Sequence, residues 1–330
     1  GFRLWSADQQ NVDRPHKINE GFSLQSAQGE MIHARYLAGM RKYGLAEQRV
    51  NRALELDPVL LPALTMKSML CLRKMEYENA YEYANRALAI DEYDPEANYL
   101  SGQAAVALGK NYDAMDRYEI AALTPELRSA AYTQLSQLHF RLGDKELAKQ
   151  YAQKSLIGNC YNVTAYQILH QICPCGEYLE KIDELDPLCH FADAERMLEG
   201  KMTAEQLAAS IKEEMVWQNY LEFAAFYHGL GLDCKAVKIL DACPADNALI
   251  ALWKAYFKGD KAAVADAEAK SIELVFPFRE ESAYVLDWAL ENGGTWRTRY
   301  LRAMLSDFLG NKQQAKELLA ADDSDYAPYY

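Results

Sequence analysis

The chain has 330 residues, half of them hydrophobic, and a formal net charge of −13 at pH 7. This length can form a substantial core, whereas the negative charge disfavours binding to nucleic acid or to an anionic membrane surface. No apolar run approaches the roughly 20 residues of a transmembrane helix, and residues 1–22 contain no apolar segment of the kind found in signal peptides.

The region 27–160 repeats a pattern with a period of 34 residues. Asn-Arg-Ala-Leu stands at 51–54 and again at 85–88. Three columns of small residues stay in register: Ala34, Ser68, Gly102 and Ser136; Ala46, Ala80, Ala114 and Ala148; and Ala53, Ala87, Ala121 and Ser155. Each unit contains two stretches of helical apolar periodicity, separated by a turn. Because small residues let two antiparallel helices approach closely, we predict four helix-turn-helix units over 27–160, preceded by a lead-in segment, 1–26.

Residues 161–330 keep the helical periodicity but lose the strict period. The expected helical segments and hairpins lie at 161–172, 176–187, 191–200, 203–215, 219–244, 247–271, 279–294 and 296–321. No segment has the pattern of a strand domain. We therefore predict an all-α fold, an α-solenoid of about nine hairpins in which the region 161–330 continues the same stack with degenerate units.

A 34-residue helix-turn-helix unit with this pattern of small and large residues resembles the tetratricopeptide repeat (TPR). The resemblance lacks the usual Trp, and the expected Gly is present only as Gly102. It implies a right-handed superhelix whose inner curve is formed by the first helix of each unit and binds a partner segment. The inward positions are then Met31, Arg35, Thr65, Met69, Arg73, Tyr99, Gln103, Thr133, Gln137 and Arg141, with Leu221, Ala225 and His228 farther along.

Within this predicted groove, Arg35, Arg73 and Arg141 are candidates for binding acidic groups of a partner. The alternative is that each of them pairs with a neighbouring Glu. A group of tyrosines at residues 77–99 could stack on sugars, or pack between hairpins as helical spacing favours. The pattern of Lys and Asn with which some TPR proteins clamp a C-terminal carboxylate is absent.

The chain also resembles the C-terminal TPR tail of long bacterial proteins that carry an N-terminal β-sandwich domain of unknown function. The matching segments are 89–109, 121–138, 275–290 and 323–330. This resemblance implies that the chain is part of a larger protein, with its own N-terminal domain as one candidate partner. Such proteins are associated with carbohydrate use, which makes a glycan a second candidate ligand.

No catalytic motif is found, so we predict no enzyme activity and no cofactor. "GLGLDC" (229–234) has Cys234 where a nucleotide-binding loop needs its third Gly. Residues 160–190 contain Cys160, His170, Cys173, Cys175, Cys189 and His190. A zinc site and a redox pair of Cys173 and Cys175 are the alternatives. The Cys-x-Cys spacing favours a cysteine-rich core with Cys173 and Cys175 at a turn, and we predict no metal site.

The sequence thus predicts a non-enzymatic scaffold that binds a protein or peptide segment in a concave groove. The alternative is an accessory, glycan-binding region of a carbohydrate-active protein. The seven cysteines are odd in number and mostly lie in apolar patterns, which favours unpaired thiols and a cytoplasmic location, while a periplasmic one stays open.

Overall fold

The computed structural model describes residues 25–320, so most of the segment 1–26 and all of 323–330 lie outside the described residues. Within that range the chain forms 19 α-helices and no strand, which confirms the all-α prediction. The first eight helices are α1 (Ala27–Gly39), α2 (Tyr43–Leu56), α3 (Leu61–Arg73), α4 (Tyr77–Leu88), α5 (Pro95–Ala107), α6 (Asn111–Ala121), α7 (Pro125–Arg141) and α8 (Lys145–Gly158).

The remaining helices are shorter on average. They are α9 (Val163–Ile172), α10 (Gly176–Leu185), α11 (Phe191–Leu198), α12 (Ala204–Ser210), α13 (Val216–Gly229), α14 (Asp233–Asp241), α15 (Ala248–Lys258), α16 (Ala263–Glu268), α17 (Glu281–Glu291), α18 (Trp296–Leu309) and α19 (Lys312–Ala320). Their positions agree with the predicted segments, except that α12 ends at Ser210, five residues before the predicted hairpin does. None of the described helices is long and apolar enough to cross a membrane.

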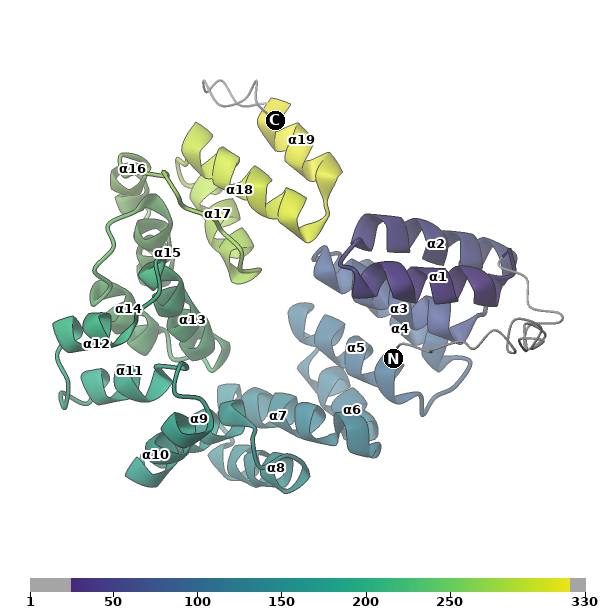
Figure 1. Ribbon diagram of the computed structural model, residues 1–330, viewed down its shortest axis with the longest axis horizontal. Helices are drawn as coiled ribbons and strands as arrows, with labels where there is room; N and C mark the ends of the chain where they lie inside the picture. The colour runs from purple at the N-terminus through teal and green to yellow at the C-terminus, as the bar shows by residue number, and fades with distance from the viewer. Residues whose placement is uncertain (1–24, 321–330) are drawn as a thin grey trace, which may run out of the picture.

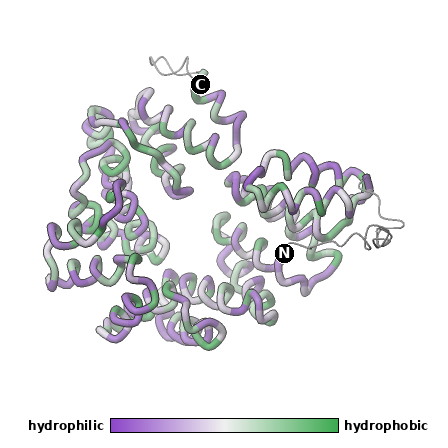
Figure 2. The backbone as a smooth tube through the Cα atoms, in the orientation of Figure 1, coloured by the Kyte–Doolittle hydropathy of each residue, from purple (hydrophilic) through white to green (hydrophobic). Residues whose placement is uncertain are grey.

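Successive helices pack in pairs, and successive pairs stack into a curved solenoid (Figure 1). Hydrophilic and hydrophobic residues alternate along most helices, as Figure 2 shows. Second helices such as α4 bury one apolar stripe and leave the opposite side polar, whereas first helices such as α5 are buried on several sides. This amphipathic pattern explains why a chain with only half its residues hydrophobic can bury a continuous core along its length.

Two of the three predicted columns of small residues, those beginning at Ala34 and at Ala46, meet inside the hairpins. Ser68 and Ser136 on the first helices are fully buried, and their hydroxyls donate hydrogen bonds of 2.8 and 2.7 Å to the backbone carbonyls of Ala80 and Ala148 on the second helices. A larger residue in either column would push the helices apart. The small columns therefore set the distance between the two helices of a unit.

In the third unit, different residues fill the contact between the two helices. Gly102 stands in the column of Ser68 and Ser136, and a Cβ atom placed on it would lie 2.7 Å from the ring of Tyr118. Tyr118 is 1% exposed, at a position 34 residues after Ala84. The missing side chain of Gly102 thus makes room for one large ring.

The hydrophobic core changes character along the chain. Between α1 and α8 it consists of small clusters, each shared by neighbouring hairpins. From Leu179 to Leu309 it is one large cluster that includes the fully buried rings of Phe191, Tyr220 and Trp253. Here large aromatic residues replace the regular small columns, which is why the strict period is lost although the hairpins persist.

The solenoid curves until its two ends touch, as Figure 1 shows where α17 and α18 approach the first hairpins. Nη2 of Arg73, on α3, donates a 3.1 Å hydrogen bond to the carbonyl of Phe308 on α18, and its guanidinium lies 4.0 Å from the ring centre of Tyr43. The hydroxyl of Tyr284 on α17 donates a 2.7 Å hydrogen bond to that of Tyr77 on α4. We call these contacts the clasp.

We expect Gly102→Ser to destabilise the protein by about 1–3 kcal/mol, because the new side chain overlaps the ring of Tyr118. In a Tyr118→Ala background the same substitution should cost much less, because the pair then resembles Ser68 and Ala84 of the second unit. Urea unfolding of the four proteins measures the coupling. An equal cost in both backgrounds would show that the ring does not account for this glycine.

We expect the double variant Arg73→Ala, Tyr284→Phe to open the solenoid, because it removes both hydrogen bonds of the clasp. A hydrogen bond from a charged donor contributes about 1.5–3 kcal/mol, enough to shift a closed–open equilibrium. Small-angle X-ray scattering should give a larger radius of gyration than for the wild type. The control is Arg86→Ala, which removes a contact with the carbonyl of Pro58 between adjacent hairpins only. Identical scattering by all three proteins would contradict a closing role for the clasp.

Candidate functional site: the central cavity

The curvature and the clasp enclose a central cavity of about 850 Å³. Helices from both halves of the chain contribute to its wall. Its lining residues are Tyr43, Met69, Leu72, Arg73, Tyr77, Leu100, Gln103, Val106, Ala107, Tyr118, Gln134, Arg141, His228, Tyr256, Glu280, Glu281 and Tyr284. The wall therefore combines aliphatic and aromatic side chains with amides and with charges of both signs.

Four of the ten predicted groove residues line this cavity: Met69, Arg73, Gln103 and Arg141. His228, predicted from the degenerate half, lines it as well. Three residues of the wall, Arg73, Ala107 and Arg141, are the final residues of α3, α5 and α7. The last turns of the first helices thus face the cavity, and the beginnings of these helices do not.

The earlier column of predicted groove residues is packed inside the solenoid. Met31, Thr65 and Thr133 are 4%, 3% and 6% exposed, so they offer almost no surface to a partner. Thr133 donates a 2.8 Å hydrogen bond to the carbonyl of Ser129, and Tyr99 packs edge-to-face on the ring of Tyr118. Thr133 also lies 2.9 Å from the hydroxyl of Ser155 on α8, and Tyr118 lies on α6, so Thr133 and Tyr99 contact second helices of the solenoid instead of a partner.

The remaining two predicted residues lie outside the cavity wall. Arg35 is exposed, and its charge acts on Glu96, whose pKa is raised by burial and by Asp94 and is partly lowered again by Arg35. Gln137 is partly buried and is not among the lining residues. Gln134, three residues earlier on α7, lies in the wall instead.

The two arginines of the wall differ in their partners. Arg73 is held by the clasp, whereas no hydrogen bond or ion pair is found for the exposed Arg141 within residues 25–320. The alternative that every groove Arg pairs with a Glu therefore does not describe Arg141. A cation without a partner in the wall of a cavity is suited to bind an anionic group.

The opposite wall carries negative charge. Glu280 and Glu281 stand at the beginning of α17. Burial and the charge of Glu281 raise the pKa of Glu280, and the charges of Arg73 and Arg279 partly offset this increase. Arg279 also forms an ion pair of 3.3 Å with Glu281. The cavity thus has a cationic side at Arg141 and an anionic side at α17.

Sequence reasoning missed Tyr43, Tyr256, Glu280 and Tyr284 as wall residues, and it named Tyr77 only within the group of tyrosines at 77–99. Tyr43 and Tyr77 come from second helices, and the other three come from the degenerate half, where inward positions were assigned near residue 220 alone. They reach the cavity because the solenoid closes on itself. Of the tyrosines crowded at 77–99, only Tyr77 lies in the wall.

His228 is the one lining residue with a geometry used in catalysis. Its Nδ1 lies 2.7 Å from Oδ1 of Asp233, as in sites where a carboxylate orients a general base. Asp233 orients the imidazole from outside the cavity wall, since it is not among the lining residues. The nearby segment 229–234 is a turn between α13 and α14, as its sequence indicated, and Gly231 there has a φ of 74°.

All seven cysteines are free. Cys160 and Cys173 are exposed, and Cys175 and Cys189 are partly buried, so these four cysteines do not form a buried core, although Cys173 and Cys175 do lie at a turn as the sequence predicted. Loops between short helices carry them, since Cys173 and Cys175 lie between α9 and α10 and Cys189 precedes α11. Within residues 25–320 they do not converge on a common point.

Comparison with known proteins gives a match of residues 129–156 to the tetratricopeptide repeat family model. No curated protein matches the chain significantly. A solved tetratricopeptide repeat protein from Parabacteroides merdae is 14% identical, over 88% of this chain and 99% of its own, with a TM-score of 0.46. PilF from Pseudomonas aeruginosa is 16% identical, over 71% and 97% of the two chains, with a TM-score of 0.46.

A third similar structure is the human IFIT1 dimer with m7Gppp-AAAA, which is 14% identical over 93% of this chain and 75% of its own, with a TM-score of 0.46. Identities and scores this low give no information on a ligand. The helices, their packing in pairs and the family match within the fourth unit all indicate the same fold. The chain is an all-α solenoid of TPR-like hairpins.

Proposed function

We propose that this protein is a non-enzymatic interaction scaffold that binds a segment of a partner protein in its central cavity. The observation that carries the proposal is Arg141, an unpaired cation in a cavity wall that otherwise consists largely of aromatic and aliphatic side chains. Repeat solenoids use such concave surfaces for binding. The resemblance to TPR proteins, which are generally non-catalytic, supports the same class of function.

The size and chemistry of the cavity limit the partner. Its volume lies within the range of about 300–1,000 Å³ that is common for pockets filled by compact ligands, so a short segment fits and a folded domain does not. The segment should carry a carboxylate for Arg141, an apolar or aromatic side chain for the tyrosines, and a basic or hydroxyl group for Glu280 and Glu281. The N-terminal β-sandwich domain of a longer parent chain could supply such a segment from a loop.

A second candidate function is glycan binding. Five tyrosines line the cavity together with Gln103, Gln134 and two glutamates. Aromatic faces that stack on sugar rings, combined with amides and carboxylates that bond their hydroxyls, would suit a neutral oligosaccharide. This candidate makes no use of the charge on Arg141, and the two functions can therefore be separated experimentally.

We expect Arg141→Glu to weaken binding of the partner segment at least about tenfold, which corresponds to 1.4 kcal/mol, because a carboxylate would then face a carboxylate. Affinity capture from the source organism, with the wild type as bait, identifies the partner. Fluorescence titration of the partner segment against wild type and variants then measures the affinity.

The matched control is Arg35→Glu, the same charge reversal at an exposed site outside the cavity, which should bind like the wild type. Equal weakening by both variants would indicate a general charge effect and contradict binding in the cavity. If the chain instead binds oligosaccharides on a glycan array, and Arg141→Glu does not alter this binding, the second function is favoured.

A further inference from the structure

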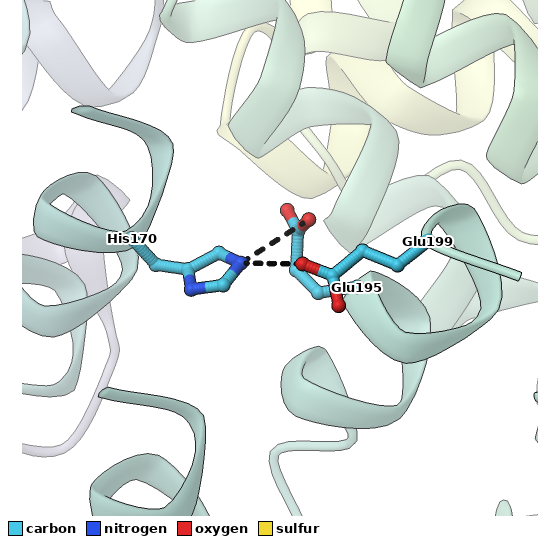
Figure 3. Close-up of side chains that lie close together, drawn as sticks. All are labelled: His170, Glu195 and Glu199. Carbon is cyan, nitrogen blue, oxygen red and sulfur yellow. Dashed lines mark ion pairs between the residues drawn. The ribbon is translucent and has the colours of Figure 1, made fainter. Parts of the chain in front are cut away.

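A buried group of ionisable side chains joins α9 to α11, away from the central cavity. His170 lies in the last turn of α9, Glu195 lies on α11, and Glu199 caps the end of α11. Their side chains are 2%, 1% and 25% exposed. Figure 3 shows the imidazole of His170 pointing towards both carboxylates. We call these three residues the His-Glu-Glu cluster.

The distances in the cluster are longer than those of ordinary hydrogen bonds. Nε2 of His170 lies 3.7 Å from Oε2 of Glu195 and 3.5 Å from Oε1 of Glu199, whereas hydrogen bonds between nitrogen and oxygen span about 2.7–3.2 Å. Two ligand atoms bound to one tetrahedral Zn²⁺, at bond lengths of about 2.0–2.2 Å, lie about 3.3–3.6 Å apart. The observed spacing therefore fits atoms that share an ion at least as well as atoms that share a proton.

Neighbouring groups hold two of the three side chains in place. Nδ1 of His170 accepts a 3.3 Å hydrogen bond from the amide N–H of Cys175 and lies 3.2 Å from the carbonyl oxygen of the same residue. These contacts fix the ring with Nε2 towards the carboxylates, and an ion bound at Nε2 would move the ring proton to Nδ1, where the carbonyl can accept it. The buried hydroxyl of Tyr227 donates a 2.7 Å hydrogen bond to Oε1 of Glu195. Metal-binding histidines and carboxylates in proteins are commonly oriented by contacts of this kind.

The charges in the cluster are suited to a cation. The buried carboxylate of Glu195 faces the hydroxyl of Tyr227, the side-chain amide of Gln171 and the ammonium of Lys235, and these donors stabilise its negative charge. Nζ of Lys235 lies 3.0 Å from Oε2 of Glu195, and Lys201 pairs with Glu199 at 2.7 Å. The side chain of Lys235 is 36% exposed, so its ammonium group can turn into solvent when another cation takes its place.

We propose that His170, Glu195 and Glu199 bind one divalent transition-metal ion, with Zn²⁺ as the best fit. One imidazole and two carboxylates form a ligand set that Zn²⁺ accepts, with water as the fourth ligand at the exposed side of Glu199. Ca²⁺ and Mg²⁺ prefer oxygen ligands only. The ion would tie α9 to α11 at the place where the regular hairpins give way to shorter helices, and none of the three residues lines the central cavity.

The test is a calorimetric titration of the full chain with Zn²⁺ after treatment with EDTA. Cys160, Cys173 and Cys234 are exposed, so they are replaced by Ser to prevent binding through thiolates. We expect one Zn²⁺ per chain, a higher melting temperature that EDTA reverses, and no such effect of Mg²⁺. His170→Gln and Glu199→Gln should each weaken Zn²⁺ binding at least about tenfold. Lys235→Met should strengthen it, because the competing ammonium is removed.

The matched control is Glu180→Gln, the same substitution at an exposed residue of α10 outside the cluster, which should leave Zn²⁺ binding unchanged. If His170→Gln fails to fold, the Zn²⁺ affinity of Glu199→Gln tests the proposal, because the side chain of Glu199 is partly exposed and its replacement should not disturb the fold. Absence of saturable Zn²⁺ binding by the parent protein would overturn the proposal. So would binding that neither cluster variant weakens, since the ion would then lie elsewhere.

Discussion

Close contact between the two helices of each hairpin is the constraint from which the regular half of this protein is built. In two of the four units a buried serine on the first helix bonds to a backbone carbonyl of the second, which is possible only while both positions are small. In the third unit the same space is shared between Gly102 and the ring of Tyr118. The combined volume of the side chains that face one another between the two helices is therefore conserved from unit to unit, whereas the individual residues can vary.

The degenerate half meets this constraint in another way. Its helices are shorter, and buried rings such as those of Phe191, Tyr220 and Trp253 fill one continuous core. A core of this kind tolerates unequal helix lengths, because large side chains can fill irregular gaps that small columns would leave open. The solenoid can thereby curve enough to bring α17 and α18 back to the beginning of the chain.

The closure of the solenoid determines which side chains face one another across the central cavity. An open solenoid would expose a shallow, mixed groove, whereas the contacts of Arg73 and Tyr77 with α17 and α18 bring glutamates and tyrosines opposite Arg141. The clasp itself uses Arg73, so one of the two cationic residues of the wall is engaged in holding the ring closed.

The sequence alone determined the fold class and the pairing of helices into hairpins, because these depend on local periodicity and on small residues at fixed spacing. It also identified Met69, Arg73, Gln103 and Arg141, which share the inner face through helical geometry. Only the tertiary structure decided that Met31, Thr65 and Thr133 are packed between helices, since this depends on how tightly successive hairpins stack. It likewise decided that Tyr284 faces Tyr77, and that His170 meets Glu195 and Glu199 in place of nearby cysteines. The pairing of Tyr77 with Tyr284 joins residues 207 apart and follows from the cumulative curvature of the whole solenoid. The meeting of His170 with Glu195 and Glu199 depends on how the short helices α9 to α11 are placed in space, and no short sequence pattern encodes either arrangement.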